Sequence, residues 1–551
     1  MENPPRPDVE DELIAAEEAQ EARHDPEADI PEARRTAFTR FLDVVEWLGN
    51  LLPHPVTLFA LFALGVVVVS GIAGFFDVSV ADPRPEGAAG RSPDGRIEAI
   101  SLMNGDGLRM IVENLVSNFV MFVPLGTVLV ALLGVGVAEG SGLLSAAIRG
   151  IVLSAPRRLI VVAIVFAGVI SNTASEVGYV VLIPLAAVIF LALGRHPLVG
   201  MAAAFAGVSG GYSANLLIGT VDPLLAGITQ EAAQLIDPGY TVHAAVNWYF
   251  MIVSTFFITL VGSWVTLRIV EPKLGTYDPS HAEEGVEDES AAEPLTAGEK
   301  KGLLWAGLAV LVVSGLFALS IVPEWGVLRN PETGEVLRSP FLNGIVALIF
   351  VFFLVPGVVY GVVTGSVRSD RDVVDGMASA MSTLGLYIVL VFFAAQFVAF
   401  FGWTNLGGIT AVTGADFLIS AGITGPAIFI PFILICCFVN LMLGSASAQW
   451  AVTAPIFVPM LMLIGYSPEV IQAAYRIGDS TTNIITPMMS YFGLILAFAA
   501  RYDKRLGIGT VVAMMLPYTI FFLIGWVMLF YLWVFVLGMP VGPEAPTFYT
   551  P

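Results

Sequence analysis

Two pairs of short polar stretches, about half of the chain apart, hold the residues best suited to chemistry. The first pair covers residues 171–175 and 209–215, and the second covers 444–450 and 478–483. Each stretch is rich in small polar residues and interrupts sequence apolar enough to lie in lipid. A spanning helix broken in this way frees backbone groups that lipid cannot satisfy, so the break must line a cavity. Matched breaks in two halves indicate the substrate site of a secondary transporter; the alternative is two unrelated helix kinks.

The polar stretches offer neutral oxygen atoms. Hydroxyl, amide and unwound carbonyl oxygens are ligands for a hard cation such as sodium, and half-helix N-termini attract an anion. A sodium site is therefore possible at the four first-half residues, although single Ser or Asn residues in membrane helices more often bond neighbouring helices. The candidates are Asn172, Ser175, Ser213 and Asn215 in the first half, and Ser445, Ser447, Thr482 and Asn483 in the second.

Charged residues inside apolar segments are few, and each is costly at the centre of a bilayer. Arg476 and Asp479 lie three apart, on one face of a predicted helix, where they can pair with each other. The pair would either bind the substrate or a proton, or would be a structural ion pair that holds the broken helix. Asp222 is either a proton carrier or a turn residue before Pro223. Glu176, beside the first tip, either carries or balances charge at the site or is an acid of the hairpin that extends to the surface. Both protons and sodium therefore remain available as coupling ions.

Trp450 follows the second polar stretch and offers a flat aromatic face. Most tryptophans of membrane proteins anchor the helix at the interface. One at a re-entrant tip would lie away from the interface. We therefore expect Trp450 to stack on the aromatic ring of a substrate.

The composition predicts the elements that position these residues. Of 551 residues, 56% are hydrophobic and 13% are charged, against about 25% charged in soluble proteins. The fold class is therefore an all-α polytopic protein of the lipid bilayer, with two broken helices at 197–230 and 468–499. With seven full-length spans these give nine transmembrane helices. The full-length spans are predicted near 54–76, 110–137, 243–270, 302–322, 340–365, 378–402 and 509–537.

Two further segments, 157–195 and 425–466, read as re-entrant helical hairpins. Each is apolar, then briefly small and polar, then apolar again. Their arms are mostly too short to cross a membrane, and the predicted tips are 171–176 and 445–449. The alternative is an ordinary pair of spanning helices joined by a tight turn.

The net charge of −21 is concentrated outside the spans. Residues 1–35 form an acidic cytoplasmic tail, and 271–301 form an acidic cytoplasmic loop; both compositions favour disorder. These segments flank a first half, 36–270, and the chain continues with a second half, 302–540, and a tail, 541–551. No basic patch indicates a nucleic-acid partner.

Lysines and arginines in short loops predict the orientation. Most of them fall on one side of the nine crossings, which places the N-terminus in the cytoplasm. The loop 77–109, which holds Arg84, Arg91 and Arg96, is the exception. This threading brings the two hairpins in from opposite sides. The halves are therefore inverted repeats, as alternating access about a site at the midplane requires.

Four long motifs resemble the AbgT family of p-aminobenzoyl-glutamate transporters. The resemblance extends over residues 40–535. It implies a bowl-shaped homodimer in a bacterial inner membrane, with nine spanning helices and two hairpins per subunit, similar in plan to divalent-anion:sodium symporters. The motifs are EWLGNLLPHP at 46–55, GRHP at 194–197, GVSGGYSANL at 207–216 and AAYRIGDSTTN at 473–483.

The resemblance also implies a function and a pocket. The substrate would be p-aminobenzoyl-glutamate, or a p-aminobenzoate-like sulfonamide antimetabolite that is exported. Gln449 stands where family members often have lysine. Direction stays open between proton-driven export, which we favour, and sodium-coupled import of a carboxylate; a channel is a third reading. The implied pocket residues are Asn440, Ser447, Trp450, Pro468, Arg476, Asp479 and Pro487, with Asp222 as the acid of the first half.

Nothing in the sequence indicates an enzyme or a cofactor. The five histidines lie in tail, loop or segment-end positions, so no catalytic triad or histidine metal cluster is expected. The two cysteines, Cys436 and Cys437, are adjacent within an apolar run and form neither a disulfide framework nor a metal site.

Overall fold

The structure, a computed structural model, describes residues 53–84, 91, 93–174, 177–283, 294–336 and 339–550. These residues belong to one compact unit that runs from Gly49 to Pro551. The acidic tail 1–35, most of the first motif, and Ser175 and Glu176 at the first tip lie outside the described residues.

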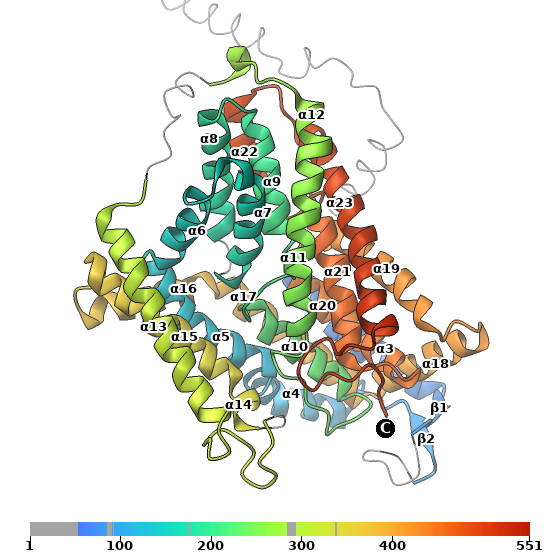
Figure 1. Cartoon of the computed structure of the whole chain (residues 1–551). Helices are drawn as coiled ribbons and strands as arrows, with labels where there is room; N and C mark the ends of the chain where they lie inside the picture. The colour runs from blue at the N-terminus through green and yellow to red at the C-terminus, as the bar shows by residue number, and fades with distance from the viewer. Residues whose placement is uncertain are drawn as a thin grey trace, which may run out of the picture. The chain divides into compact units, whose positions relative to one another are not determined.

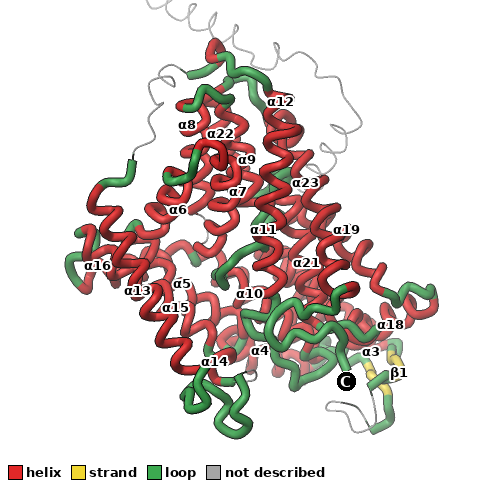
Figure 2. The backbone as a smooth tube through the Cα atoms, in the orientation of Figure 1, coloured by secondary structure: helices red, strands yellow, loops and turns green. Residues whose placement is uncertain are grey.

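The fold class is confirmed: the described chain is almost entirely helical and polytopic (Figure 1). A single antiparallel pair of short strands, β1 (Ser79–Ala81) and β2 (Arg96–Glu98), interrupts it (Figure 2). Helices occupy all seven predicted full-length spans. They are α3 (Pro55–Phe75), α4 with α5 (Gly105–Val120, Val123–Gly140), α11 with η5 and α12 (Trp248–Val265, Thr266–Val270, Glu271–Leu274), α13 (Ala297–Ile321), α15 (Ile345–Thr364), α17 (Gly385–Trp403), and α23 with η9 (Ile508–Tyr531, Leu532–Val536).

Some predicted boundaries are wrong. The predicted span 378–402 includes the end of a separate helix, α16 (Asp370–Thr383), because Ser369 and Asp372 form a capping box that starts a polar helix there. The span at 110–137 is interrupted between α4 and α5, where Pro124 lies in the first turn of α5. Other helices had no predicted counterpart. They are α6 (Leu143–Leu153), α18 (Leu406–Ser420) and the short η6 (Pro279–His281). The predicted span 340–365 begins with a separate short helix, α14 (Pro340–Asn343).

The first hairpin has two short arms. Its first arm consists of η1 (Arg157–Leu159) and α7 (Ile160–Ser171), which bends by 109° from α6. The tip begins with η2 (Asn172–Ala174). The second arm consists of the π-helical η3 (Gly178–Leu182) and α8 (Ile183–Ala192).

The second hairpin has longer arms than predicted. They are η8 (Pro426–Ile428) with α19 (Phe429–Leu443), and α20 (Ala446–Leu463). Each arm is 18 residues long, so within the described chain these two complete a set of nine helices long and apolar enough to cross a membrane. The prediction of short arms is wrong here because Ser445 caps the helix, and the supposed tip residues after it form the first turns of α20.

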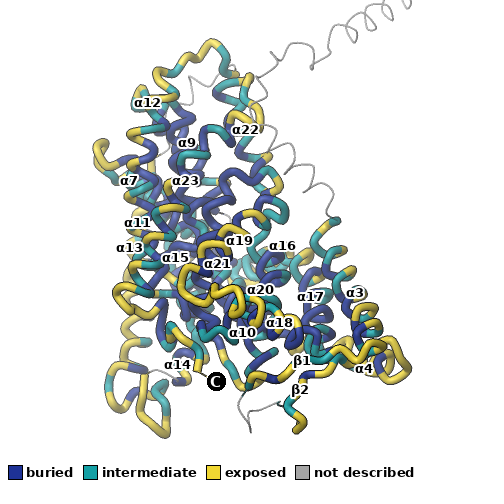
Figure 3. The backbone as a smooth tube through the Cα atoms, turned by 90° about the vertical axis from the view of Figure 1, so that its right-hand side faces the viewer, coloured by how far each residue is buried: buried dark blue, intermediate teal, exposed yellow. Residues whose placement is uncertain are grey.

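The two broken helices are present. The first consists of α9 (Pro197–Phe205) with the π-helical η4 (Ala206–Gly210), then an irregular stretch, then α10 (Val221–Ala233). The second consists of α21 (Pro468–Asn483), an irregular stretch, and α22 (Phe492–Tyr502). Every residue of α21 is buried, and Figure 3 shows α9, α20 and α21 in the buried interior.

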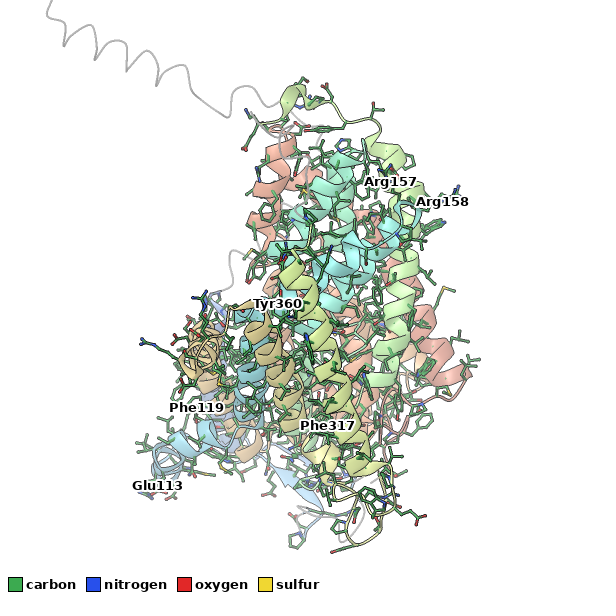
Figure 4. The ribbon with its side chains drawn as sticks, turned by 60° about the vertical axis from the view of Figure 1, so that its left-hand side comes forward. Glu113, Phe119, Arg157, Arg158, Phe317 and Tyr360 are labelled. Atoms are coloured by element: carbon green, nitrogen blue, oxygen red, sulfur yellow. The ribbon has the colours of Figure 1, made fainter. Side chains whose placement is uncertain are left out.

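The two ends of the helical bundle differ in their residues. At the end where α8, α12 and α22 meet, Arg195 forms an ion pair with Glu271 at 2.7 Å, and Figure 4 labels Arg157 and Arg158 near this end. The opposite end holds the C-terminal segment and the strands β1 and β2 (Figure 1). Arg96 lies in β2 at this opposite end, and the orientation inferred from the charge pattern stays a prediction.

Candidate functional site

A cavity of about 290 Å³ lies where the two hairpin tips meet the two helix breaks. Both halves contribute to its wall, so segments far apart in the sequence enclose one space. Four of the predicted candidates, Asn172, Ser445, Ser447 and Asn483, line it. The other lining residues are Val128, Leu132, Tyr179, Tyr212, Thr220, Val221, Leu224, Leu384, Tyr387, Gly444, Ala446, Met489, Ser490 and Tyr491.

Aromatic rings dominate one part of the cavity wall. Tyr179 of the first hairpin and Tyr491 of the second helix break stack with centroids 4.6 Å apart and planes 10° from parallel. Tyr212 and Tyr387 line the same cavity. Such a wall suits a flat aromatic ligand, because rings gain from offset stacking beyond the area that they bury.

Behind the cavity, Arg476 forms a buried ion pair with Asp222, and both residues are about 2% exposed. Arg476 Nη2 donates to Asp222 Oδ1 at 2.6 Å, and Asp222 Oδ2 accepts from the amide of Gly219 at 2.7 Å. The predicted pairing of Arg476 with Asp479 is wrong: the side chain of Arg476 reaches across to α10, which packs against α21. Asp222 is therefore a buried partner rather than a turn residue at the surface.

Asp479 is left without a hydrogen-bond partner for either carboxylate oxygen among the described residues, although it is fully buried. Arg476 Nη1 is also unpartnered there. Burying an unpaired polar group is costly, so such groups are retained where a ligand, an ion or a proton completes them. Asp479 and Arg476 are therefore candidates for binding a ligand, an ion or a proton.

A chain of hydrogen bonds extends from Arg476 along α21. Asn247 Oδ1 accepts from Arg476 Nε at 3.0 Å and from Gln472 Nε2 at 2.7 Å. Thr229 donates to Gln472 Oε1 at 2.6 Å and accepts from the indole of Trp450 at 2.9 Å. The network joins α10, α20 and α21 to the connection that precedes α11.

Trp450 lies away from the cavity. It is in the second turn of α20 rather than at the tip, it is fully buried, and its ring stacks on Tyr475 with centroids 4.2 Å apart. One face of the indole is therefore already occupied by protein. The prediction that this face meets a substrate ring does not fit the geometry, since capping by Ser445 draws Trp450 into the helix.

The other predicted pocket residues support the break rather than line the cavity. Asn440 Nδ2 lies within 2.9 Å of the backbone oxygen of Asp479 and the side-chain oxygens of Thr482 and Asn483. It thereby holds the end of α21 against α19. Pro468 begins α21, and Pro487 is half-buried in the stretch between α21 and α22.

The first-half oxygens are partly used within the protein. Asn215 Oδ1 accepts from the hydroxyl of Thr173 at 2.8 Å, and Asn172 Nδ2 donates to the carbonyl of Gly211 at 3.3 Å. Asn172 Oδ1 and Ser213 Oγ have no partner among the described residues. Two of the four predicted sodium ligands therefore offer free oxygens, while Ser175 lies outside the described chain. No cluster of three or more His, Cys, Asp and Glu residues suited to a metal occurs in the described chain.

Comparison with known proteins identifies the family. The model of the AbgT transporter family matches residues 40–549. The p-aminobenzoyl-glutamate transport protein of Escherichia coli (strain K12) is 38% identical over 500 residues, which cover 91% of this chain and 95% of that protein. The chain belongs to the AbgT family.

Two solved structures of AbgT transporters resemble this one. MtrF of Neisseria gonorrhoeae, described as illuminating a class of antimetabolite efflux pumps, is 62% identical with a TM-score of 0.86, covering 92% of this chain and all of its own. The YdaH transporter of Alcanivorax borkumensis, described as having an unusual topology, is 44% identical with a TM-score of 0.82, covering 89% of this chain and all of its own. The predicted resemblance to the AbgT family is thus confirmed.

Several buried polar residues of this AbgT protein were not predicted from its sequence. A signal for some of them exists in α21, whose polar side chains recur every three or four residues and so share one face of the helix. Asn247 and Thr229 give no comparable signal, because each is a single polar residue near the end of an element. The recurring set is Glu469, Gln472, Arg476, Asp479 and Asn483.

Proposed function

We propose that this AbgT protein is a secondary active transporter of p-aminobenzoyl-glutamate or of p-aminobenzoate-like antimetabolites such as sulfonamides. The observation that carries the proposal is the cavity enclosed by both hairpins and both helix breaks. A site shared between two halves can open to either side when one half moves against the other, which is alternating access. The relatives are described as a p-aminobenzoyl-glutamate transport protein and as antimetabolite efflux pumps, which supports this substrate class.

The chemistry of the cavity suits an aromatic ring that carries polar groups. Tyr179 and Tyr491 supply aromatic surface, while Asn172, Ser447 and Asn483 supply neutral hydrogen-bonding groups. Among the residues that the structure describes, none that lines the cavity is charged. A substrate carboxylate would therefore find its cation in the layer behind, at Arg476.

Arg476 would act by exchanging partners. Its guanidinium is bonded to Asp222 through one nitrogen, and Nη1 has no partner among the described residues. A planar guanidinium can hold a carboxylate or sulfonamide oxygens through two parallel hydrogen bonds. The substrate would compete with Asp222 for Arg476, and Asp222 or Asp479 would take up a proton when the charge balance changes.

We propose proton-driven export across a bacterial inner membrane, with the N-terminus in the cytoplasm and a homodimer as the assembly. The carboxylate of Asp479, which has no hydrogen-bond partner among the described residues, supports a proton as the coupling ion. The free oxygens of Asn172 and Ser213 support the alternative, sodium-coupled import of a carboxylate. The hairpins would be re-entrant, and the halves would divide at the acidic loop 271–301.

Transport by purified protein in liposomes tests the proposal. Labelled p-aminobenzoyl-glutamate should accumulate against its gradient when a proton gradient is imposed alone, because coupling supplies the free energy. Excess unlabelled substrate on the opposite side should drive counterflow, which a channel cannot show. Accumulation under a sodium gradient alone, insensitive to a protonophore, would instead establish the sodium-coupled alternative.

A further inference from the structure

Besides Asp479, helix α21 contains another buried carboxylate, at the end of the helix that is far from the cavity. Glu469 is the second residue of the helix and is 2% exposed. The hydroxyl of Tyr240 donates to both of its carboxylate oxygens at 3.0 Å. Glu469 forms no ion pair with any residue in the described ranges. A buried carboxylate without a cation favours its neutral form, whereas the helix N-terminus favours the anion. The two effects oppose each other, so Glu469 can change its charge.

The backbone of Glu469 is bonded to the residue that holds Arg476. Asn247 Nδ2 donates to the carbonyl of Glu469 at 2.8 Å, and Asn247 Oδ1 accepts from Arg476 Nε. Tyr240 and Asn247 both belong to the short connection between α10 and α11. The group that binds the Glu469 carboxylate and the group that positions Arg476 therefore move on one segment of backbone.

Tyr240, which binds Glu469, follows exposed backbone at the end of the bundle that carries the C-terminus. Pro238 and Gly239, immediately before Tyr240, are exposed. The C-terminal segment lies over the start of α21, where the backbone amide of Ser467 donates to the carbonyl of Thr547 at 3.2 Å. A proton can therefore reach this carboxylate without passing through the cavity.

The titratable groups around Glu469 are few. Tyr240 and Ser467 contact it, and the carboxylate of Glu544 faces it from the C-terminal segment. Beyond Tyr240 lie Asp237 and Tyr549, whose hydroxyl donates to Asp237 at 3.4 Å; Arg84 bonds the carbonyl of Ile236, and His243 lies near Pro543. Burial, together with the Glu469 carboxylate, raises the pKa of Tyr240, so this tyrosine keeps its own proton.

We propose that Glu469 is a proton-binding site, linked through Tyr240 and Asn247 to the Arg476–Asp222 ion pair. A proton from the solvent neutralises the carboxylate of Glu469, and no other group of the protein loses a proton. The hold of Tyr240 on Glu469 weakens, the connection before α11 shifts, and Asn247 loosens its hydrogen bond to Arg476. Arg476 is then freer to accept the substrate. This role rests on the proposed function, because Arg476 is taken to bind substrate.

Two measurements test the proposal, and the first needs no substrate. Infrared difference spectra of the purified protein between pH 8 and pH 5 should contain a protonated-carboxyl band. Glu469→Gln should lose the part of the band that belongs to Glu469, and Tyr240→Phe, which removes only the hydroxyl, should displace that part. Glu231→Gln is the matched control, since Glu231 is a half-buried glutamate of α10 that accepts from the amide of Val123 instead. A band unchanged in Glu469→Gln overturns the proton site.

The second measurement tests the link to substrate binding. The Kd of p-aminobenzoyl-glutamate for the wild type should fall by about fivefold or more between pH 8 and pH 5, the usual size of such coupling. Glu469→Gln should bind at both pH values as the wild type does at pH 5. Asn247→Ala should keep the infrared band and lose the pH dependence. Wild-type pH dependence in Glu469→Gln overturns the proposal. If the wild type binds no p-aminobenzoyl-glutamate at any pH, the proposed function fails, and the infrared result alone decides whether Glu469 binds a proton.

Discussion

In the first broken helix Gly207 is followed by Val208 and Ser209, and in the second Gly478 is followed by Asp479 and Ser480. A Cβ on Gly207 would collide with the carbonyl oxygen of Val165 in α7, and one on Gly478 would come within 2.6 Å of Cys436 Cβ in α19. Each glycine thus lets a broken helix approach the first arm of its own hairpin. The packing is the same in both halves, while the next residue is apolar in one and charged in the other.

This difference extends along the whole of both helices. No charged residue occurs in α9 and η4, whereas α21 carries Glu469, Arg476 and Asp479. In the first half, Asp222 at the start of α10 is the acid that pairs with Arg476. An inverted pair of similar backbones therefore does not imply two equal sites. The second half concentrates the charges, and the first half supplies a counter-charge and neutral oxygens.

The largest effect is expected from breaking the buried ion pair between Arg476 and Asp222, which joins the halves. Arg476→Met leaves Asp222 buried and unpaired, which should destabilise the protein by about 3–5 kcal/mol and abolish transport. The double variant Arg476→Met/Asp222→Leu should recover most of the stability, because both charges are gone, but no transport. Thermal unfolding in detergent and liposome flux measure the two properties. A double variant as unstable as the single one would show that the pair does not couple the halves.

Arg476→Lys refines the same test. Lysine keeps the charge and the ion pair with Asp222 but cannot present two parallel donors to a carboxylate. The variant should fold normally and lose most transport. Wild-type kinetics in Arg476→Lys would contradict a bidentate role for Arg476.

The next effect tests whether the packing is equivalent in the two halves. Gly207→Ala and Gly478→Ala should each destabilise the protein by about 1–3 kcal/mol, because the new methyl group meets backbone or a packed side chain. Gly126→Ala in α5 is the control, since nothing lies within 4 Å of its Cβ position. That variant should gain about 0.5–1 kcal/mol from helix propensity. Unequal losses of stability in Gly207→Ala and Gly478→Ala would show that the packing is not equivalent in the two halves.

The sequence predicts the breaks better than it predicts partners. Gly, Ser and Asn interrupt an apolar run at 207–215, and the helix ends there after Gly210, because lipid leaves few other solutions. The similar stretch 478–483 was predicted as a break but stays helical as the end of α21, and the irregular stretch follows it at 484–491. The partner of Arg476 could not be read in the same way. Asp222 lies 254 residues away, and only the packing of α10 against α21 brings the two together. Likewise, the tip of a hairpin and the capped start of a helix contain the same residue types. The sequence therefore predicted a tip at 445–449, where α20 in fact begins.

A smaller effect is expected from making the second half resemble the first. Asp479→Val copies Val208 and removes a buried carboxylate that has no hydrogen-bond partner in the described chain. Stability should rise by about 1–3 kcal/mol. Flux driven by a proton gradient should be lost, while Asp479→Asn should lose flux with little change in stability. Loss of stability in Asp479→Val would mean that the carboxylate has a structural partner instead of a role in coupling.

The aromatic residues after each tip give a further contrast. Tyr179 stacks on Tyr491 across the halves, whereas Trp450 stacks on Tyr475 within the second half. Tyr179→Leu should therefore weaken substrate binding by about 0.5–1.5 kcal/mol, because it removes a stacking surface of the cavity. Trp450→Phe keeps its stack, loses only the bond to Thr229, and should leave the Kd of p-aminobenzoyl-glutamate unchanged. A larger loss of affinity in Trp450→Phe than in Tyr179→Leu, by calorimetry, would restore Trp450 as the substrate's contact.

The smallest effect concerns the neutral oxygens of the first half. Asn172→Ala and Ser213→Ala each remove an oxygen that has no hydrogen-bond partner in the described ranges, so stability should change by less than about 1 kcal/mol. If protons drive transport through the charged second half, flux under a proton gradient should stay close to wild type in both variants, with or without sodium. Asn215→Ala is the control, because Asn215 Oδ1 already accepts from Thr173 and its loss should lower stability without altering ion dependence. A wild type that needs sodium, with a requirement that rises in Asn172→Ala and Ser213→Ala alone, would assign coupling to the first half and reverse the division of labour between the two.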